Sequence, residues 1–141
     1  MLQDQVIAEA RDWIGTPYHQ GAKVKGCGCD CVTFVAGVLE RLSIGPCVVP
    51  PVYSIRPDGT LLRHLRANQD LYRQLQPSQR QAGDVLLMRL DREPQHFGIL
   101  TERGTLVHAH IRHGVVETTI SHDMADKILF TLRPVAYEVA P

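Results

Sequence analysis

Hydrophobic residues recur at helical spacing near the start of the chain, with polar residues between them. The hydrophobic positions are Val6, Ile7, Ala10, Trp13 and Ile14. Residues three or four apart share one face of a helix, so this pattern predicts an amphipathic helix. We expect Asp4 to be its N-cap and Gly15, before Thr16-Pro17, to end it.

A second helix is predicted to begin at Cys31, directly after a glycine-rich loop. Its hydrophobic face consists of Cys31, Val35, Val38, Leu39 and Leu42. Asp30 stands where an N-cap belongs, and Gly45-Pro46 is expected to stop the helix.

The segment that follows is rich in proline and then becomes helical again. We interpret Pro46–Gly59 as an ordered surface loop. Thr60–Gln76 is predicted to be a third helix, and its basic residues are expected to form a solvated face.

From Gly83 onward the hydrophobic pattern changes to a period of two, which is typical of strands. The predicted strands are Asp84–Leu90, His96–Thr101, Thr105–Ile111, Gly114–Ile120 and Ile128–Pro134. Turns are expected at Glu102–Gly104 and Arg112–Gly114. Helices in the first half and an antiparallel meander of about five strands in the second predict an α+β fold.

Composition narrows the class of protein. The length of 141 residues suggests one domain, residues 1–141. Lys and Arg together number 15, as do Asp and Glu, so net charge gives no case for a nucleic-acid partner.

No apolar run approaches the roughly 20 residues of a membrane span. The N-terminus lacks a basic start, so no signal peptide is visible and we expect a cytoplasmic protein as synthesised.

Three of the four cysteines, Cys27, Cys29 and Cys31, alternate within a stretch of five residues. This spacing fits structural zinc poorly, because such sites usually offer CxxC pairs. The three are also too close for easy disulfide pairing, although Cys47 could reach one of them. For Cys27 and Cys29 we favour the role of small hydrophobic residues.

Cys31 differs from the other cysteines because it would occupy the first turn of a helix. Helical N–H groups and the helix dipole stabilise a thiolate there, and the Cys31 N–H could help to hold an oxyanion. These features make Cys31 a candidate nucleophile, although a buried cysteine at a helix start would give the same pattern.

A thiolate nucleophile needs a base, and the base needs an orienting partner. Alternate residues of a strand share a face, so an odd-length loop would bring His96 opposite or diagonal to His108, with His110 as the competitor. An even-length loop would turn His108 to the other face. Each histidine by itself could equally be an ordinary strand residue with satisfied hydrogen bonds.

Taken together, the motifs resemble those of the NlpC-type cell-wall cysteine peptidases. The first lies in WIGTPYHQGAKVKGCGCDCVTFV, which contains G-x-P-Y and then Asp-Cys at a helix start. Gly83-Asp84, His96-Phe97-Gly98-Ile99 and Val107-His108-Ala109 follow in the order of the family. The ordered set spans about Gly15 to Ala109.

The resemblance implies a papain-like fold, with N-terminal helices packed on the antiparallel sheet. It also implies Cys31 as nucleophile, His96 as base, His108 as orienting group, and Tyr18 as a contact for substrate or oxyanion; we add Asp30 to that second group. No metal or organic cofactor is expected. The implied partner is the peptidoglycan stem peptide, cleaved between D-glutamate and the diamino acid.

Two departures from the family pattern bear on substrate preference. Val32-Thr33-Phe34 replaces the usual Ser-Gly-Leu, and Ala22 replaces the second glycine of a Gly-Gly pair. The GCDC motif and the absence of a visible export signal resemble the phage-borne branch, which implies tail proteins as partners and delivery to the wall with a particle. The alternatives are a thiol acyltransferase or amidase on the same fold, or a non-catalytic tail-assembly or metal-binding module.

Overall fold

The computed structural model describes residues 1–44, 66–67, 70–90 and 93–139. Two helices of the first half, α1 (Leu2–Asp12) and α2 (Cys31–Arg41), flank a short hairpin of β1 (Lys23–Val24) and β2 (Gly28–Cys29). Six strands build the main sheet: β3 (Tyr72–Leu75), β4 (Val85–Leu90), β5 (Glu93–Leu100), β6 (Thr105–His110), β7 (Gly114–Thr119) and β8 (Ile128–Pro134). Three short helical segments complete the described elements: η1 (Pro77–Gln79), α4 (His122–Asp126) and α5 (Ala136–Val139). This arrangement confirms the predicted α+β class.

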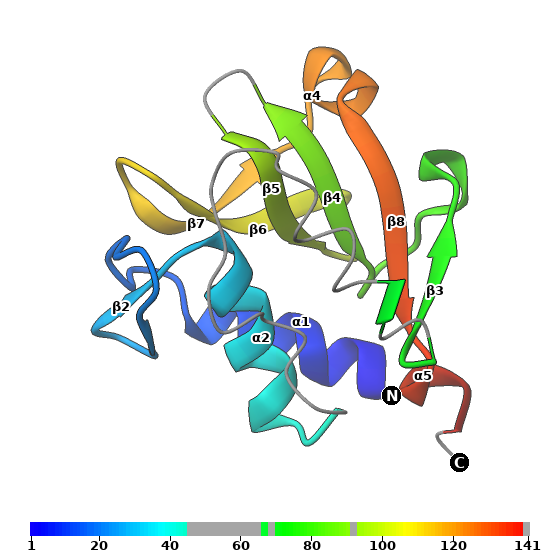
Figure 1. The fold of residues 1–141 in the computed structure, drawn as a ribbon, viewed down its shortest axis with the longest axis horizontal. Coiled ribbons are helices and arrows are strands. Elements are labelled where there is room, and N and C mark those ends of the chain that lie inside the picture. The colour runs from blue at the N-terminus through cyan, green and yellow to red at the C-terminus, as the bar shows by residue number, and fades with distance from the viewer. Residues whose placement is uncertain (45–65, 68–69, 91–92, 140–141) are drawn as a thin grey trace.

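The main sheet has the order β3-β8-β4-β5-β6-β7 (Figure 1), and each strand runs antiparallel to its neighbours. Strands β4 to β7 form a meander as predicted, but the fifth predicted strand, β8, does not continue it, because it pairs with β4 and not with β7. The described sheet has six strands in place of about five. Strand β8 then returns to the other side of β4, and β3 joins it at the edge. No helix in the described ranges has the length and hydrophobicity needed to cross a membrane.

The predicted third helix, Thr60–Gln76, is wrong at its C-terminal end, because Tyr72–Leu75 is strand β3. This segment pairs with β8 from Tyr72 opposite Pro134 to Leu75 opposite Thr131. Pairing along a free sheet edge outweighs a helical hydrophobic pattern, since local propensity is a weak determinant beside tertiary contacts. Residues 60–65 and the predicted loop at 46–59 lie outside the described residues.

The predicted helix boundaries need two further corrections. Helix α1 begins at Leu2 with Met1 as its N-cap, so Asp4 lies in the first turn and is not the cap. Its carboxylate instead lies 3.6 Å from the N-terminal ammonium group. Helix α2 ends at Arg41, before the Gly45-Pro46 pair that was expected to stop it.

Helices α1 and α2 pack against each other and against the same side of the sheet, with α2 over β5 and β6 (Figure 1). Trp13 meets Phe34 of α2 edge to face, with ring centroids 5.9 Å apart. Gly37 lets this contact form, because a Cβ atom there would lie 2.5 Å from the Trp13 ring. A second, smaller cluster fills the opposite side of the sheet and includes Leu86, Met88 and Leu106.

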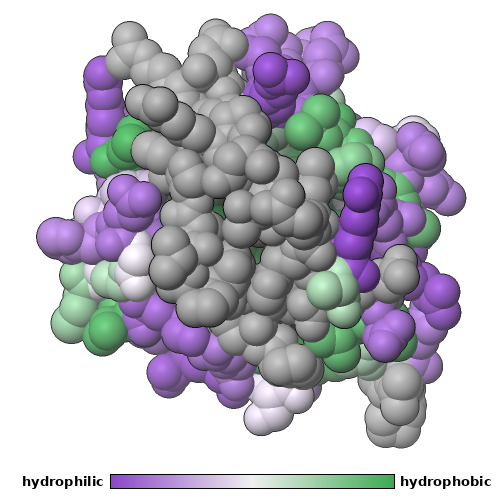
Figure 2. Space-filling view, in the orientation of Figure 1, coloured by the Kyte–Doolittle hydropathy of each residue, from purple (hydrophilic) through white to green (hydrophobic). Residues whose placement is uncertain are grey.

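Exposed hydrophobic side chains are scattered among the residues that the structure describes. On the face in Figure 2, hydrophilic side chains predominate among the coloured residues, and hydrophobic ones form small separate areas. In the described ranges, the exposed large hydrophobic residues are Met1, Ile14, Val24, Ile111 and Leu129.

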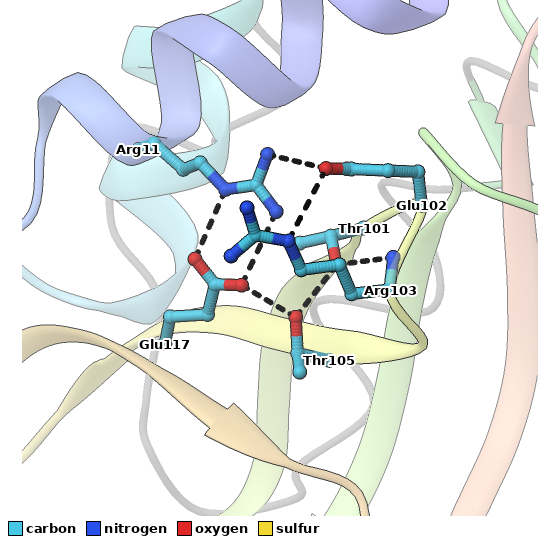
Figure 3. Close-up of polar contacts among 6 residues, drawn as sticks. All are labelled: Arg11, Thr101, Glu102, Arg103, Thr105 and Glu117. Carbon is cyan, nitrogen blue, oxygen red and sulfur yellow. Dashed lines mark hydrogen bonds and ion pairs between the residues drawn. The ribbon is translucent and has the colours of Figure 1, made fainter.

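An ionic clamp, made by Arg11 with Glu117 and Glu102, joins α1 to β7 at the edge of the sheet (Figure 3). Arg11 donates to both carboxylate oxygens of Glu117 on β7, at 3.0 and 3.2 Å, and to Glu102 at 2.7 Å. The Thr105 hydroxyl donates to Glu117 at 2.6 Å and also contacts the Thr101 hydroxyl. Hydrogen bonds from Arg11 and then Thr105 lower the pKa of Glu117, so the clamp is charged at neutral pH.

Replacing Arg11 with methionine is expected to lower the free energy of unfolding by about 1–2 kcal/mol, because the half-buried Glu117 loses its bidentate partner. Urea denaturation at pH 7 measures the difference. Arg112→Met, at an exposed position, is the matched control and should change stability by less than about 0.5 kcal/mol. Equal stability of the two variants would show that the clamp contributes nothing.

Candidate active site

Cys31 is the first residue of α2 and is 9% exposed. The carboxylate of Asp30 accepts hydrogen bonds from the backbone N–H groups of Val32 and Thr33, at 3.0 and 2.9 Å. The Thr33 hydroxyl accepts in return from the Asp30 N–H at 2.8 Å, which completes a reciprocal capping box. The predicted N-cap is confirmed, and Cys31 lies at the positive end of the helix dipole.

The glycine-rich loop is tied to the residues just before Cys31. The second carboxylate oxygen of Asp30 accepts from the Gly21 N–H at 2.7 Å. Cys29 donates its N–H to Pro17 and accepts from the His19 N–H, which holds Tyr18 beside β2. These contacts give Asp30 a positioning role. Its predicted contact with substrate or oxyanion stays a prediction, as does that of Tyr18.

The three alternating cysteines have separate environments, and all are free thiols. Cys27 is exposed, whereas Cys29 is fully buried in β2. Burial, together with the neighbouring Asp30 charge, raises the pKa of the Cys29 thiol to about 12, so Cys29 stays protonated. Cys47 lies outside the described residues.

His96 on β5 and His108 on β6 form a buried pair. Their Nε2 and Nδ1 atoms lie 2.7 Å apart in a hydrogen bond, and the rings meet nearly at right angles. The strands pair with Ile99 opposite Val107 and Leu100 opposite Leu106. Continued by one pair, this register puts Gly98 opposite His108 and His96 diagonal to it. The predicted pairing of even positions with even is therefore confirmed.

His110 does not take the place of His108 beside His96. Its Nδ1 accepts the N–H of Arg112 at 3.0 Å, and its ring stacks on His113 with centroids 4.7 Å apart. The centroid of His110 is 6.3 Å from that of His108. Of the two histidines that the sequence left open, the structure brings His108 to His96.

Both paired histidines are neutral at pH 7. Burial, followed by the neighbouring His108 and His110, lowers the pKa of His96 to about 3. Burial first and His110 second lower the pKa of His108 to about 4. A neutral imidazole has one nitrogen that donates and one that accepts a proton, which is the form a base requires.

Helix α2 packs against the two strands that carry the histidine pair. Cys31 belongs to the same core cluster as Phe97 of β5 and Val107 of β6. The three candidate residues thus come from one helix and two neighbouring strands that pack together, although they span more than 70 positions of the sequence. Within the described ranges, no group of three or more potential ligands could hold a metal ion.

Thr118 on β7 is a hydrogen-bond partner of His108 that the sequence analysis missed. Its hydroxyl lies 2.9 Å from Nε2 of His108. The length of the Arg112–Gly114 turn could have predicted this contact. An odd-length turn pairs even positions of β6 with even positions of β7, which puts Thr118 on the same face as His108. The observed register has Leu106 opposite Thr118 and His108 opposite Val116.

Acidification is expected to destabilise the fold below about pH 6.5. In the unfolded chain His96 and His108 bind protons near their ordinary pKa of about 6.5, whereas the folded pair does so only near pH 3 to 4. The unfolded state therefore gains protons first, and about 1–3 kcal/mol of stability should be lost as the pH falls from 6.5 to 4. Urea denaturation at several pH values measures this loss.

The matched control for the pH experiment is the exposed His122. A variant with both His96→Gln and His108→Gln should show a flatter pH dependence than the wild type, whereas His122→Gln should not. Identical pH dependence of the double variant and the wild type would contradict the assignment of buried neutral histidines.

The sequence profile of the NlpC/P60 family matches residues 15–133. The chain therefore belongs to the NlpC/P60 family. A search of curated proteins finds no match.

Solved structures with the same fold include three that are similar over 93% of this chain. The NlpC/p60 domain of the peptidoglycan hydrolase SagA is 24% identical, has a TM-score of 0.61 and is covered over 97% of its chain. The P60 domain of an antigen from M. avium subspecies paratuberculosis is 15% identical, with a TM-score of 0.64 and 93% of its chain covered. An NlpC/P60 protein from Bacillus cereus is 17% identical, with a TM-score of 0.68, and this chain spans 39% of its length. These similarities establish a papain-like NlpC/P60 fold.

Proposed function

We propose that this protein is a cysteine peptidase that hydrolyses amide bonds in peptidoglycan stem peptides, of the D-glutamyl–diamino acid type. The observation that carries the proposal is the buried His96–His108 hydrogen bond on the strands against which the Cys31 helix packs. Family membership supports it, because the SagA domain and RipB of Mycobacterium tuberculosis are peptidoglycan hydrolases.

In the proposed cycle, neutral His96 takes the thiol proton of Cys31. The thiolate then attacks the carbonyl carbon of the substrate, a C–S bond forms, and the carbonyl electrons move to oxygen. The Cys31 N–H, with Tyr18, stabilises the resulting oxyanion. Collapse breaks the C–N bond, and the leaving amine takes its proton from His96.

Water completes the cycle by hydrolysing the thioester. His96 accepts a proton from the water as its oxygen attacks the acyl carbon, the C–S bond breaks, and the departing Cys31 thiolate takes that proton back from His96. His108 holds the imidazole of His96 in one orientation throughout, through the 2.7 Å hydrogen bond. Burial lowers the pKa of both imidazoles, which favours transfer of the thiol proton to His96 during attack over a resting thiolate–imidazolium pair.

Substrate preference is expected to differ from that of relatives with the usual Ser-Gly-Leu. The three residues after Cys31 are buried, and Thr33 completes the capping box. They therefore act on substrate through the placement of the helix start. Association with phage tail proteins, and delivery to the wall by a particle, stay predictions from the motif resemblance.

Digestion of defined muropeptides followed by mass analysis tests the proposed function. The expected products differ from the substrate by one water, with the new amine on the diamino acid. Repeating the digestion with hydroxylamine tests for the thioester intermediate, because a hydrolase and an acyltransferase would both release a hydroxamate from it. The acyltransferase alternative is therefore tested in the digestion without hydroxylamine. Products joined to an acceptor amine in place of water would identify an acyltransferase, and no product from any wall peptide would overturn the proposed function.

A further inference from the structure

We propose that Thr118 is a positioning residue that fixes the tautomer of His108 and, through it, the proton-accepting nitrogen of His96. The inference rests on the proposed function. It adds a fourth residue to the predicted catalytic group of Cys31, His96 and His108. Thr118 touches neither substrate nor nucleophile in this scheme, and it acts only through His108.

The geometry forms one continuous chain of hydrogen bonds. Nε2 of His96 meets Nδ1 of His108 at 2.7 Å, and Nε2 of His108 meets the Thr118 hydroxyl at 2.9 Å. His96 and His108 are 0% and 3% exposed, so water competes poorly for these atoms. Both ring nitrogens of His108 are thereby engaged by side chains from its two neighbouring strands.

Only two proton arrangements satisfy this chain when both rings are neutral. In one, His96 donates from Nε2 to His108, and His108 donates from Nε2 to the Thr118 oxygen. In the other, the Thr118 hydroxyl donates to Nε2 of His108, and His108 donates from Nδ1 to Nε2 of His96. His96 then carries its own proton on Nδ1. The first leaves the Nδ1 lone pair of His96 as the proton acceptor, so it is the arrangement that the proposed reaction requires.

The Thr118 oxygen is the terminal acceptor in that arrangement. A hydroxyl can accept while its own proton points elsewhere, so it accommodates the Nε2–H of His108. When His96 becomes an imidazolium, its Nε2–H donates more strongly to His108. The His108–Thr118 bond then keeps His108 from rotating or exchanging its tautomer at the moment that His96 is charged.

Strand β7 holds Thr118 firmly enough for this role. Its neighbour Glu117, on the opposite face of the strand, is locked by Arg11 and Thr105 (Figure 3). The pairing with β6 continues without a shift from Thr105 opposite Thr119 to His110 opposite Gly114. The hydroxyl therefore occupies a position defined by backbone pairing and by the clamp.

Nitrogen-15 NMR of the protein labelled at histidine tests the inference without substrate. Wild-type His108 is expected to show a protonated Nε2 and an unprotonated Nδ1. A protonated Nδ1 in the wild type would overturn the inference directly. Thr118→Val should give a mixture of tautomers at His108, whereas Thr118→Ser, which keeps the hydroxyl, should behave as the wild type.

Kinetics of muropeptide cleavage supply the second measurement. Thr118→Val should lower kcat by about tenfold with KM little changed, since losing the acceptor leaves a buried donor unsatisfied. Thr118→Ser should restore most of kcat, and Thr119→Val, at the exposed neighbouring position, is the matched control. Equal losses in the serine and valine variants would overturn the inference, because the hydroxyl would then be irrelevant.

The two proposals fail in distinguishable ways. If the wild type cleaves no wall peptide but His108 shows the expected tautomer and loses it in Thr118→Val, the proposed function is wrong and the role of Thr118 stands. If the wild type cleaves and Thr118→Val keeps both tautomer and kcat, the role of Thr118 is wrong and the function stands.

Discussion

Replacing Cys31 with alanine is expected to abolish hydrolysis of stem peptides, with a loss in kcat/KM of at least about 10,000-fold. No other group in the proposed cycle can form the covalent acyl intermediate. The substitution removes one buried sulfur atom and leaves the Asp30–Thr33 capping box intact, so the fold should persist. Product formation by the purified variant, measured by mass analysis, checks the expectation.

The neighbouring cysteines provide matched controls for this experiment. Cys27→Ser should keep most of the activity, because Cys27 is exposed and joins no described contact of the site. Cys29→Ser should also keep activity, with some loss of stability because Cys29 is fully buried. Full activity of Cys31→Ala would exclude a thiol nucleophile at this position.

Replacing His96 with glutamine is expected to lower kcat by about a thousandfold, because the reaction loses its base. Glutamine is the informative choice. Its amide can reach the place of Nε2 and keep the hydrogen bond to Nδ1 of His108, so the loss reports the proton acceptor and not a broken pair. Alkylation of Cys31 by iodoacetamide across pH gives an independent readout, and its rate near pH 7 should fall in the variant.

A double variant distinguishes a catalytic His96 from a purely structural one. If Cys31 and His96 act as a unit, then Cys31→Ala combined with His96→Gln should be no slower than Cys31→Ala alone. The free energy of unfolding, measured on each single variant, distinguishes a loss of stability from a loss of catalysis. A His96→Gln enzyme with wild-type kcat and alkylation rate would refute the assignment of His96 as base.

The local sequence was sufficient to predict those features that depend on residues close together in the chain. Asp30 before Cys31 predicted the N-cap, since capping involves residues two and three positions apart. The even–even pairing of His96 with His108 followed from the parity of one short turn. The same reasoning applied to the next turn would have predicted Thr118 as a partner of His108.

Sequence reasoning failed where a distant strand determined the outcome. The hydrophobic pattern around Tyr72–Leu75 suits a helix, yet β8, some 60 residues later, offers an edge whose backbone groups need partners. The cap of α1 was misplaced for a smaller reason, because acidic residues are favoured both at the cap and in the first turn.

The sequence by itself determined the α+β class, the capped helix start at Cys31 and the face shared by His96 and His108. Each of these depends on periodicity, capping or turn parity, which act over a few residues. Only the tertiary structure decided that His108 and not His110 meets His96, that Thr118 completes the chain, and that burial keeps both rings neutral. Those properties depend on which strands are neighbours and on how deeply they are covered, and both arise from packing across the whole chain.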